Sequence, residues 1–258
     1  MPLRSDDPAW LVPGWPVPTG VRAAVSTRLG PGVSVAPFDR FNLGMRSGDD
    51  PAAVAANRVA LQAALDLPRS PQWLQQVHGT EVCVVRDAAG LEEPIADAAI
   101  TRACGQPLVI LTADCLPVLL CSDDGSVIGA AHAGWRGLAA GVIERTAAAM
   151  APDPSRVRVW LGPCIGLASY EVGEEVRAAF VDGDAGAASC FVPTRPGHWR
   201  CDLAALARRR LQAMGVTQVA GGGFDTFTDA RFYSHRRDGA RSGRFASVIW
   251  LDEAPASP

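Results

Sequence analysis

Five strand-like segments follow one another between residues 73 and 132 without a helical pattern between them, and this feature limits the possible folds most strongly. They cover residues 73–78, 81–86, 108–113, 116–121 and 127–132. Further strands are expected at 21–28, 156–161, 216–220 and 245–251, and helices at 51–67, 138–150, 174–180 and 203–214. Strands that occur in runs, rather than in strict β–α–β alternation, favour an α+β fold with a mixed sheet. Because the sequence contains no repeat and no clear linker, we expect a single domain over residues 1–258, with its core at about 20–252.

The charged residues exclude several classes of function. The net charge is −3, whereas proteins that bind nucleic acids or anionic membranes usually carry a basic surplus. All 24 basic residues are arginine, so catalysis by a Schiff-base lysine, a P-loop lysine or a Ser-Lys dyad is excluded. An anionic substrate must therefore be held by arginine, by backbone N–H groups or by a metal.

The cysteines and the apolar segments indicate a cytoplasmic protein. The seven cysteines form no CxxC pair and are odd in number, which argues against a disulfide framework. The first residues contain no apolar signal core. The most apolar run, residues 107–121, is interrupted by Asp114 and Pro117 and is too short to span a bilayer.

Three segments place rare polar residues at the ends of expected strands, beside turn-forming residues. They are QQVHG at 75–79, TADCLP at 112–117 and AHAGWRG at 131–137, and they contribute His78, Cys115 and His132. Strand ends lie at the rim of a sheet, where binding and catalytic sites are usually assembled. We therefore expect these three side chains to form the site.

Two histidines and a cysteine are compatible with several chemistries. Zinc accepts imidazole and thiolate ligands, and a catalytic zinc site uses three of them and leaves one position open. Asp114 and Glu81 lie near enough in the sequence to orient the ligands or carry protons. Alternatively, Cys115 is a nucleophile with His132 as its base, or the site binds copper. Single buried histidines and cysteines are also often purely structural.

Other candidate residues lie in arginine-containing segments and glycine-rich turns. Trp135 and Arg136 are in the turn HAGWRG, which leads into a helix whose N-terminus can bind an anion. The turn GPCIG contains Cys164, and there the small residues favour a tight turn over a catalytic role. The arginines in distinctive segments are candidates for phosphate binding, although most arginines form solvated ion pairs; they include Arg28, Arg46 and Arg58.

The chain resembles the bacterial laccase-domain family, also called the purine nucleoside phosphorylase or peptidoglycan-editing-factor family and formerly described as multicopper polyphenol oxidase-like. The resemblance extends from residues 26–28 to residues 249–251. The matching blocks are FNLG (41–44), GDDP (48–51), NR (57–58), WLQQVHG (73–79), ADA (96–98), TADCLPVLL (112–120), AAHAGWRGLAAGV (130–142), LGPCIG (161–166), YEVG (170–173) and RRDG (236–239). Together these blocks are highly specific for the family.

This resemblance implies a mixed β-sandwich core flanked by helices and a metal site at His78, Cys115 and His132, with zinc as the usual metal and copper binding possible in vitro. It also implies phosphorolysis of adenosine, inosine, guanosine and methylthioadenosine to the base and a ribose 1-phosphate, with deamination of adenosine as a second activity. The expected partners are thus purine nucleosides and phosphate, and no particular oligomeric state is favoured.

The same resemblance extends the set of candidate site residues. Asp114 and Glu81 are the candidate proton carriers, Arg58, Arg46 and Arg28 the candidate phosphate ligands, and the nucleoside pocket is expected to include Asn42, Trp135, Arg136 and Cys164. The chain departs from many relatives at Asp225-Thr226, where Cys-Thr is common, and at His235, where tyrosine is common.

Three other functions remain as alternatives. Relatives of this fold include a bacterial toxin cysteine hydrolase, so a hydrolase that uses Cys115 and His132 on cell-wall precursors or amides is the main rival. A copper phenol oxidase ranks third, because these ligands can bind a single copper and the four-electron reduction of oxygen generally needs several redox equivalents. A structural zinc domain would require a fourth protein ligand, and the sequence shows none.

Overall fold

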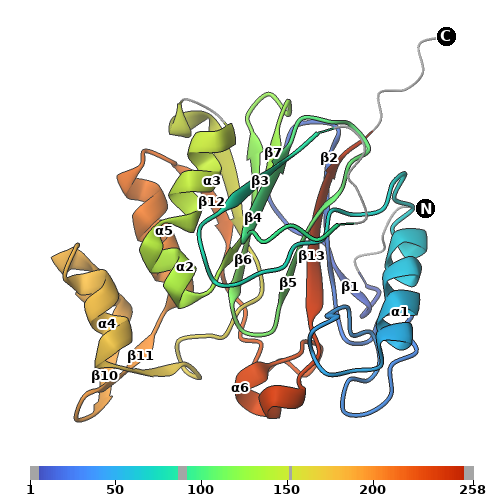
Figure 1. Cartoon of the computed structure of the whole chain (residues 1–258). Coiled ribbons are helices and arrows are strands. Elements are labelled where there is room, and N and C mark those ends of the chain that lie inside the picture. The colour runs from blue at the N-terminus through green and yellow to red at the C-terminus, as the bar shows by residue number, and fades with distance from the viewer. Residues whose placement is uncertain (1–5, 87–91, 151–152, 253–258) are drawn as a thin grey trace.

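The computed structural model describes residues 6–86, 92–150 and 153–252. Two β-sheets pack face to face and helices cover both outer faces (Figure 1). This arrangement confirms the expected mixed α+β fold. Among the described residues, no helix is both long and apolar enough to cross a bilayer.

The larger sheet has six strands in the order β12-β8-β6-β7-β4-β3. The pairs β12–β8 and β3–β4 are parallel and the three inner pairs are antiparallel. The strands are β3 (Val82–Val85), β4 (Ala98–Thr101), β6 (Leu116–Ser122), β7 (Ile128–Ala133), β8 (Val157–Leu161) and β12 (Gln218–Gly221). Every residue of β6 and β7 is buried, because both faces of this sheet are covered.

The second sheet is fully antiparallel and has four strands in the order β1-β2-β13-β5. These are β1 (Trp10–Leu11), β2 (Val21–Ser26), β5 (Leu108–Thr112) and β13 (Phe245–Leu251). Its inner face packs against β6 and β7 through side chains that include Leu119, Ile128, Phe232 and Phe245. A small antiparallel sheet of β9 (Glu171–Gly173), β11 (His198–Cys201) and β10 (Phe191–Arg195) lies to one side.

Three helices cover the outer face of the six-stranded sheet, and one helix covers the outer face of the four-stranded sheet (Figure 1). The three are α2 (Trp135–Ala140), α3 (Val142–Met150) and α5 (Leu203–Ala213). A further helix, α4 (Glu174–Val181), packs against the small sheet and against α2. On the other side, α1 (Pro51–Ala64) begins at Asp50, whose carboxylate accepts a hydrogen bond from Ala52 N at 3.0 Å. A one-turn helix, α6 (His235–Asp238), precedes β13.

The expected strand at 73–78 is wrong: the structure has one isolated bridge there, at Gln75, and another just before it, at Gln72. The side chain of Gln76 takes over the hydrogen bonding of a strand, because its amide group donates to Leu111 O at 2.8 Å and accepts from Leu111 N at 2.9 Å. The expected helix at 138–150 begins earlier, at Trp135, and is divided at Gly141, whose φ is 96°.

Candidate metal centre

The structure brings together the three side chains that the sequence singled out. His78 lies in the loop before β3, Cys115 directly precedes β6, and His132 is on β7 opposite Pro117. One ligand atom from each lies within 4.8 Å of the other two. His78 Nε2 and Cys115 Sγ are 3.8 Å apart, and the two imidazole rings meet edge to face at 4.7 Å between centroids. These atoms can therefore bind one metal ion.

A single buried carboxylate, Asp97, connects two of the three ligands. It lies directly before β4 and accepts a hydrogen bond from His132 Nδ1 at 2.8 Å. The same carboxylate accepts hydrogen bonds from the backbone N–H groups of residues 77, 78 and 79, at 3.1, 2.9 and 2.6 Å. It therefore fixes the ring of His132, leaves Nε2 of that ring for a metal, and holds the loop that carries His78.

Asp97 is ionised in spite of its burial. Burial raises the pKa of Asp97. The hydrogen bonds from His132 and from the backbone N–H groups of Gly79 and Val77 outweigh this effect, so the pKa lies below its usual value. The sequence analysis included this residue in the ADA block but assigned it no role. The signal was a lone acid between alanines directly before an apolar strand.

Backbone conformation at two residues turns the ligands toward one another. His78 and Asp114 have positive φ angles, 62° and 86°, which are uncommon for residues other than glycine. Gly134 faces them so closely that a Cβ atom there would lie 2.9 Å from His78 Cδ2 and 3.0 Å from Cys115 Sγ. Only glycine therefore fits at position 134 without displacing a ligand.

Asp114 positions the turn beside Cys115, since both of its carboxylate oxygens are engaged. Oδ1 accepts a hydrogen bond from Thr226 Oγ1 at 2.7 Å and Oδ2 accepts from Arg236 N at 2.6 Å. Thr226 belongs to the segment in which the chain departs from many relatives. Its hydroxyl gives position 226 a clear role, whereas the neighbouring Asp225 bonds instead to Ser169 and to Gly166 N.

The histidines favour the thiolate form of Cys115. Burial raises the pKa of this thiol, but the charges and hydrogen bonds of His132 and His78 lower it to about 6. Burial also opposes the charge of His132, while the Cys115 thiolate and Asp97 raise its pKa to about 9. A thiolate is the form that binds a metal and also the form that acts as a nucleophile.

Two adjoining pockets open at the site. The first has a volume of 310 Å³ and is lined by the three ligands, by Asp114 and by the apolar and aromatic side chains of Trp135, Ile165, Tyr170 and Leu203. The second has a volume of 160 Å³ and contains Arg46 and Arg58. The two share Gln76, Leu111 and Arg244 as a common wall.

The expected phosphate ligands fall in two different places. Arg46 and Arg58 line the second pocket, where both pair with Glu93 at 2.7 and 2.6 Å. Arg58 also lies over the Trp73 ring, 3.9 Å from its centroid. Arg28 lines neither pocket.

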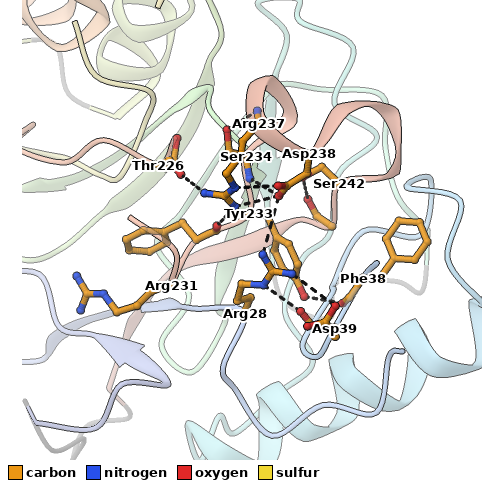
Figure 2. Close-up of polar contacts among 12 residues, drawn as sticks. Arg28, Phe38, Asp39, Thr226, Arg231, Tyr233, Ser234, Arg237, Asp238 and Ser242 are labelled. Atoms are coloured by element: carbon orange, nitrogen blue, oxygen red, sulfur yellow. Dashed lines mark hydrogen bonds and ion pairs between the residues drawn. The ribbon is translucent and has the colours of Figure 1, made fainter. Parts of the chain in front are cut away.

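Arg28 belongs instead to a structural network beneath α6 (Figure 2). It contacts Asp39 at 3.6 Å and Asp238 at 4.0 Å. The hydroxyl of Tyr233 donates to Phe38 O at 2.7 Å, and Arg237 donates to Thr226 O at 3.0 Å. This network fixes the segment at 226–238, from which the Thr226 hydroxyl and the Arg236 backbone N–H group donate hydrogen bonds to Asp114.

The remaining predicted residues are not all at the pockets. Trp135 lines the first pocket, and Arg136 lies over its ring at 4.4 Å but is not among the lining residues. Cys164 is buried outside the pocket, and burial raises its pKa well above the usual value. Glu81 is 77% exposed and lies 3.6 Å from Arg145. Asn42 is buried behind the second pocket.

A sequence model of the family described as "multi-copper polyphenol oxidoreductase laccase" matches residues 22–252. The chain belongs to this family. A Xylella fastidiosa relative named "purine nucleoside phosphorylase" is 55% identical over 95% of this chain and 98% of its own length. The Escherichia coli relative, "purine nucleoside phosphorylase YfiH", is 46% identical over 93% and 98%.

Two solved protein structures have the same fold as this chain. The Neisseria meningitidis protein NMB0706 is 42% identical, with a TM-score of 0.90 over 95% of this chain and 100% of that chain. YlmD from Geobacillus stearothermophilus is 31% identical, with a TM-score of 0.84 over 95% and 97%. The resemblance found in the sequence is therefore confirmed at the level of family and fold.

Proposed function

We propose that this chain is a metal-dependent purine nucleoside phosphorylase that acts on adenosine, inosine, guanosine and methylthioadenosine, with deamination of adenosine as a second activity. Several relatives across the family carry the name purine nucleoside phosphorylase. The observation that carries the proposal is the pair of connected pockets, one with the three metal ligands and aromatic walls and the other with arginines.

The residues fit a resident metal ion, and zinc suits them best. Two imidazoles and one thiolate within 4.8 Å of one another are a typical donor set for zinc, and Asp97 orients His132 as such sites require. Copper accepts the same ligands, so it can bind in vitro. Among the described residues the group has three members, which fits a catalytic site with an open position better than a closed structural one. When held by these residues, which line the first pocket, zinc would supply a Lewis acid.

The chain's own residues divide the remaining tasks. The aromatic rings of Trp135 and Tyr170 offer flat apolar surfaces for a purine. Arg58 and Arg46 offer positive charge for phosphate in the adjoining pocket. Asp114 lines the first pocket, but both of its carboxylate oxygens accept hydrogen bonds from the chain, so its task is to hold the backbone beside Cys115 in place.

The test is to measure zinc content and the phosphate-dependent release of base from adenosine and inosine. Cys115→Ala should lose both the metal and the activity. Cys104→Ala is the matched control, because Cys104 is also a free cysteine but is exposed and lines neither pocket. A metal-free wild-type protein that leaves both nucleosides intact would refute the proposal.

The second candidate function is a cysteine hydrolase, and the lowered pKa of Cys115 beside His132 supports it. This reading predicts amide hydrolysis that survives treatment with a chelator and is abolished by alkylation of Cys115. Cys164 provides an internal reference, because its buried thiol should be alkylated far more slowly. Phenol oxidase activity has less support, since the described residues offer one three-ligand group.

A further inference from the structure

Arg244 lies where the two pockets meet and is the arginine that lines both of them. It directly precedes β13 in the four-stranded sheet, whereas Cys115 and His132 are on strands of the six-stranded sheet or next to them. Its guanidinium group is therefore placed between the metal ligands and the pair Arg46 and Arg58.

The charge of Arg244 forms no ion pair in the described part of the chain, although Cys115 and Asp114 are near enough to favour its charged form. Arg46 and Arg58 share the carboxylate of Glu93, but no described carboxylate lies within ion-pair distance of Arg244. Its Nη1 donates to Ser242 O at 2.7 Å and to Gly243 O at 2.9 Å. Among the described residues, its Nε and Nη2 have no hydrogen-bond acceptor. A partly buried guanidinium stays charged, so it favours an anion in the adjoining space.

The FNLG segment at 41–44 fixes the backbone of Arg244 and the base of its side chain. Asn42 Oδ1 accepts hydrogen bonds from Arg244 N at 2.8 Å and from Gly44 N at 3.0 Å. Leu43 N donates to Arg244 O at 3.0 Å. A Cβ atom on Gly44 would lie 2.7 Å from Arg244 Cγ, so the stem of the arginine packs directly against this glycine. The cation is thus held in place before any ligand binds, which lowers the entropic cost of binding.

The same segment also fixes the second pocket. Arg58 Nε donates to Leu43 O at 3.0 Å, so Arg58 and Arg244 are tied to adjacent peptide groups of one loop. The loop therefore links the guanidinium group of Arg58 to the backbone that carries Arg244. Arg244 brings an unpaired charge and Arg58 brings further N–H donors, and such a combination suits an anion with several oxygen atoms, such as phosphate.

We propose that Arg244 positions inorganic phosphate at the junction of the two pockets and that Asn42 is the residue that positions Arg244. This inference rests on the proposed phosphorylase function. One phosphate oxygen forms a bond to the ribose C1′ atom as the C1′–N9 bond breaks, and the electron pair of that bond leaves with the purine. Arg244 contacts phosphate oxygens that do not react, so it would hold the attacking oxygen in the first pocket, close to the ribose.

The experiment compares metal-loaded wild-type protein with Arg244→Met, Arg244→Lys and Arg241→Met. Arg241→Met is the matched control, because Arg241 lies three positions away, is exposed and lines neither pocket. For Arg244→Met we expect the KM for phosphate to rise at least about tenfold, as loss of a charge-assisted hydrogen bond implies. The KM for inosine should change little, Arg244→Lys should recover part of the loss, and Arg241→Met should match the wild type.

An unchanged KM for phosphate in Arg244→Met would overturn the inference while leaving phosphorolysis itself established. An equal rise in the KM for phosphate and for inosine, without recovery in Arg244→Lys, would overturn it too, because that pattern indicates a structural role. If the wild type shows no phosphorolysis, the proposed function fails, and calorimetric titration with inorganic phosphate alone decides the inference. Weaker phosphate binding by Arg244→Met then supports the site, and equal binding refutes it.

Discussion

Replacement of Asp97 by asparagine should weaken both the fold and the metal site. The carboxylate is fully buried, and each of its oxygens accepts two hydrogen bonds: Oδ1 from His78 N and His132 Nδ1, and Oδ2 from Val77 N and Gly79 N. An asparagine side chain has one oxygen and one NH2 group. Whichever way the amide is oriented, its NH2 group faces two donors, so two hydrogen bonds are lost.

The size of the effect follows from these two bonds. A hydrogen bond to a charged group contributes roughly 1.5–3 kcal/mol, so Asp97→Asn should lower the free energy of unfolding by about 3–6 kcal/mol. Even 3 kcal/mol would lower the melting temperature of a chain of this size by about 6–12 °C. Loss of a residue that orients a metal-binding histidine typically weakens metal affinity by about 10–100-fold.

The assay is urea unfolding of chelator-treated protein, followed by competitive zinc titration of the folded variants. Asp182→Asn is a suitable control, because Asp182 is an exposed aspartate outside both pockets and should behave as the wild type. The reasoning is refuted if Asp97→Asn unfolds within about 0.5 kcal/mol of the wild type, which is the usual range for a surface substitution. Unchanged zinc affinity would refute the proposed orienting role.

Two further predictions concern the neighbourhood of the site. Gly134→Ala should reduce the free energy of zinc binding more than the free energy of unfolding. The new Cβ atom would lie 2.9 Å from His78 Cδ2 and 3.0 Å from Cys115 Sγ, so it would displace the ligands. Zinc titration and thermal unfolding of the apo protein measure the two effects. Glu93→Gln should destabilise the protein at neutral pH, with a difference from the wild type that shrinks on acidification. Burial raises the pKa of Glu93, but Arg58 and Arg46 outweigh this effect, so the pKa lies below the usual 4.5. Its stabilisation is therefore fully present above pH 4.5 and is lost as the pH falls through the lower folded-state pKa, which urea unfolding at a series of pH values measures. A difference that is independent of pH would contradict this assignment.

The elements that sequence reasoning located well are those whose pattern arises from burial alone. The expected strands at 108–113, 116–121 and 127–132 match β5, β6 and β7 to within about one residue at each end, because the two-layer core requires continuous apolar sequence there. The short strand β4 was missed, since its residues Ala98–Thr101 are small and few. The loop at 73–78 resembled a strand because of Trp73, Leu74 and Val77, but several of its hydrogen bonds involve the side chains of Gln76 and Asp97 instead.

Site residues could be predicted where the residue type itself indicates the chemistry, and could not be predicted where the role depends on three-dimensional packing. His78, Cys115 and His132 could be singled out because such residues are rare beside strand ends. Asp97 left only a weak signal, a lone acid between alanines, and Arg244 left none, since an aspartate or arginine gains its role from the residues that surround it. Asn42 contacts Arg244 across 202 positions of sequence, and no local pattern reveals that contact.

The two halves of the site are carried by different sheets. Two of the metal ligands move with β6 and β7, whereas Arg244 moves with β13, and Arg58 with the helix packed behind that sheet. The distance between the metal ligands and the arginines is thus a property of the layer of side chains between the sheets, which includes Leu119, Ile128 and Phe245. A substitution that changes the volume of these side chains would therefore change the distance between the metal ligands and the arginines, which the substrate must span. Substitutions in the core, far from the substrate, would in this way change the turnover rate.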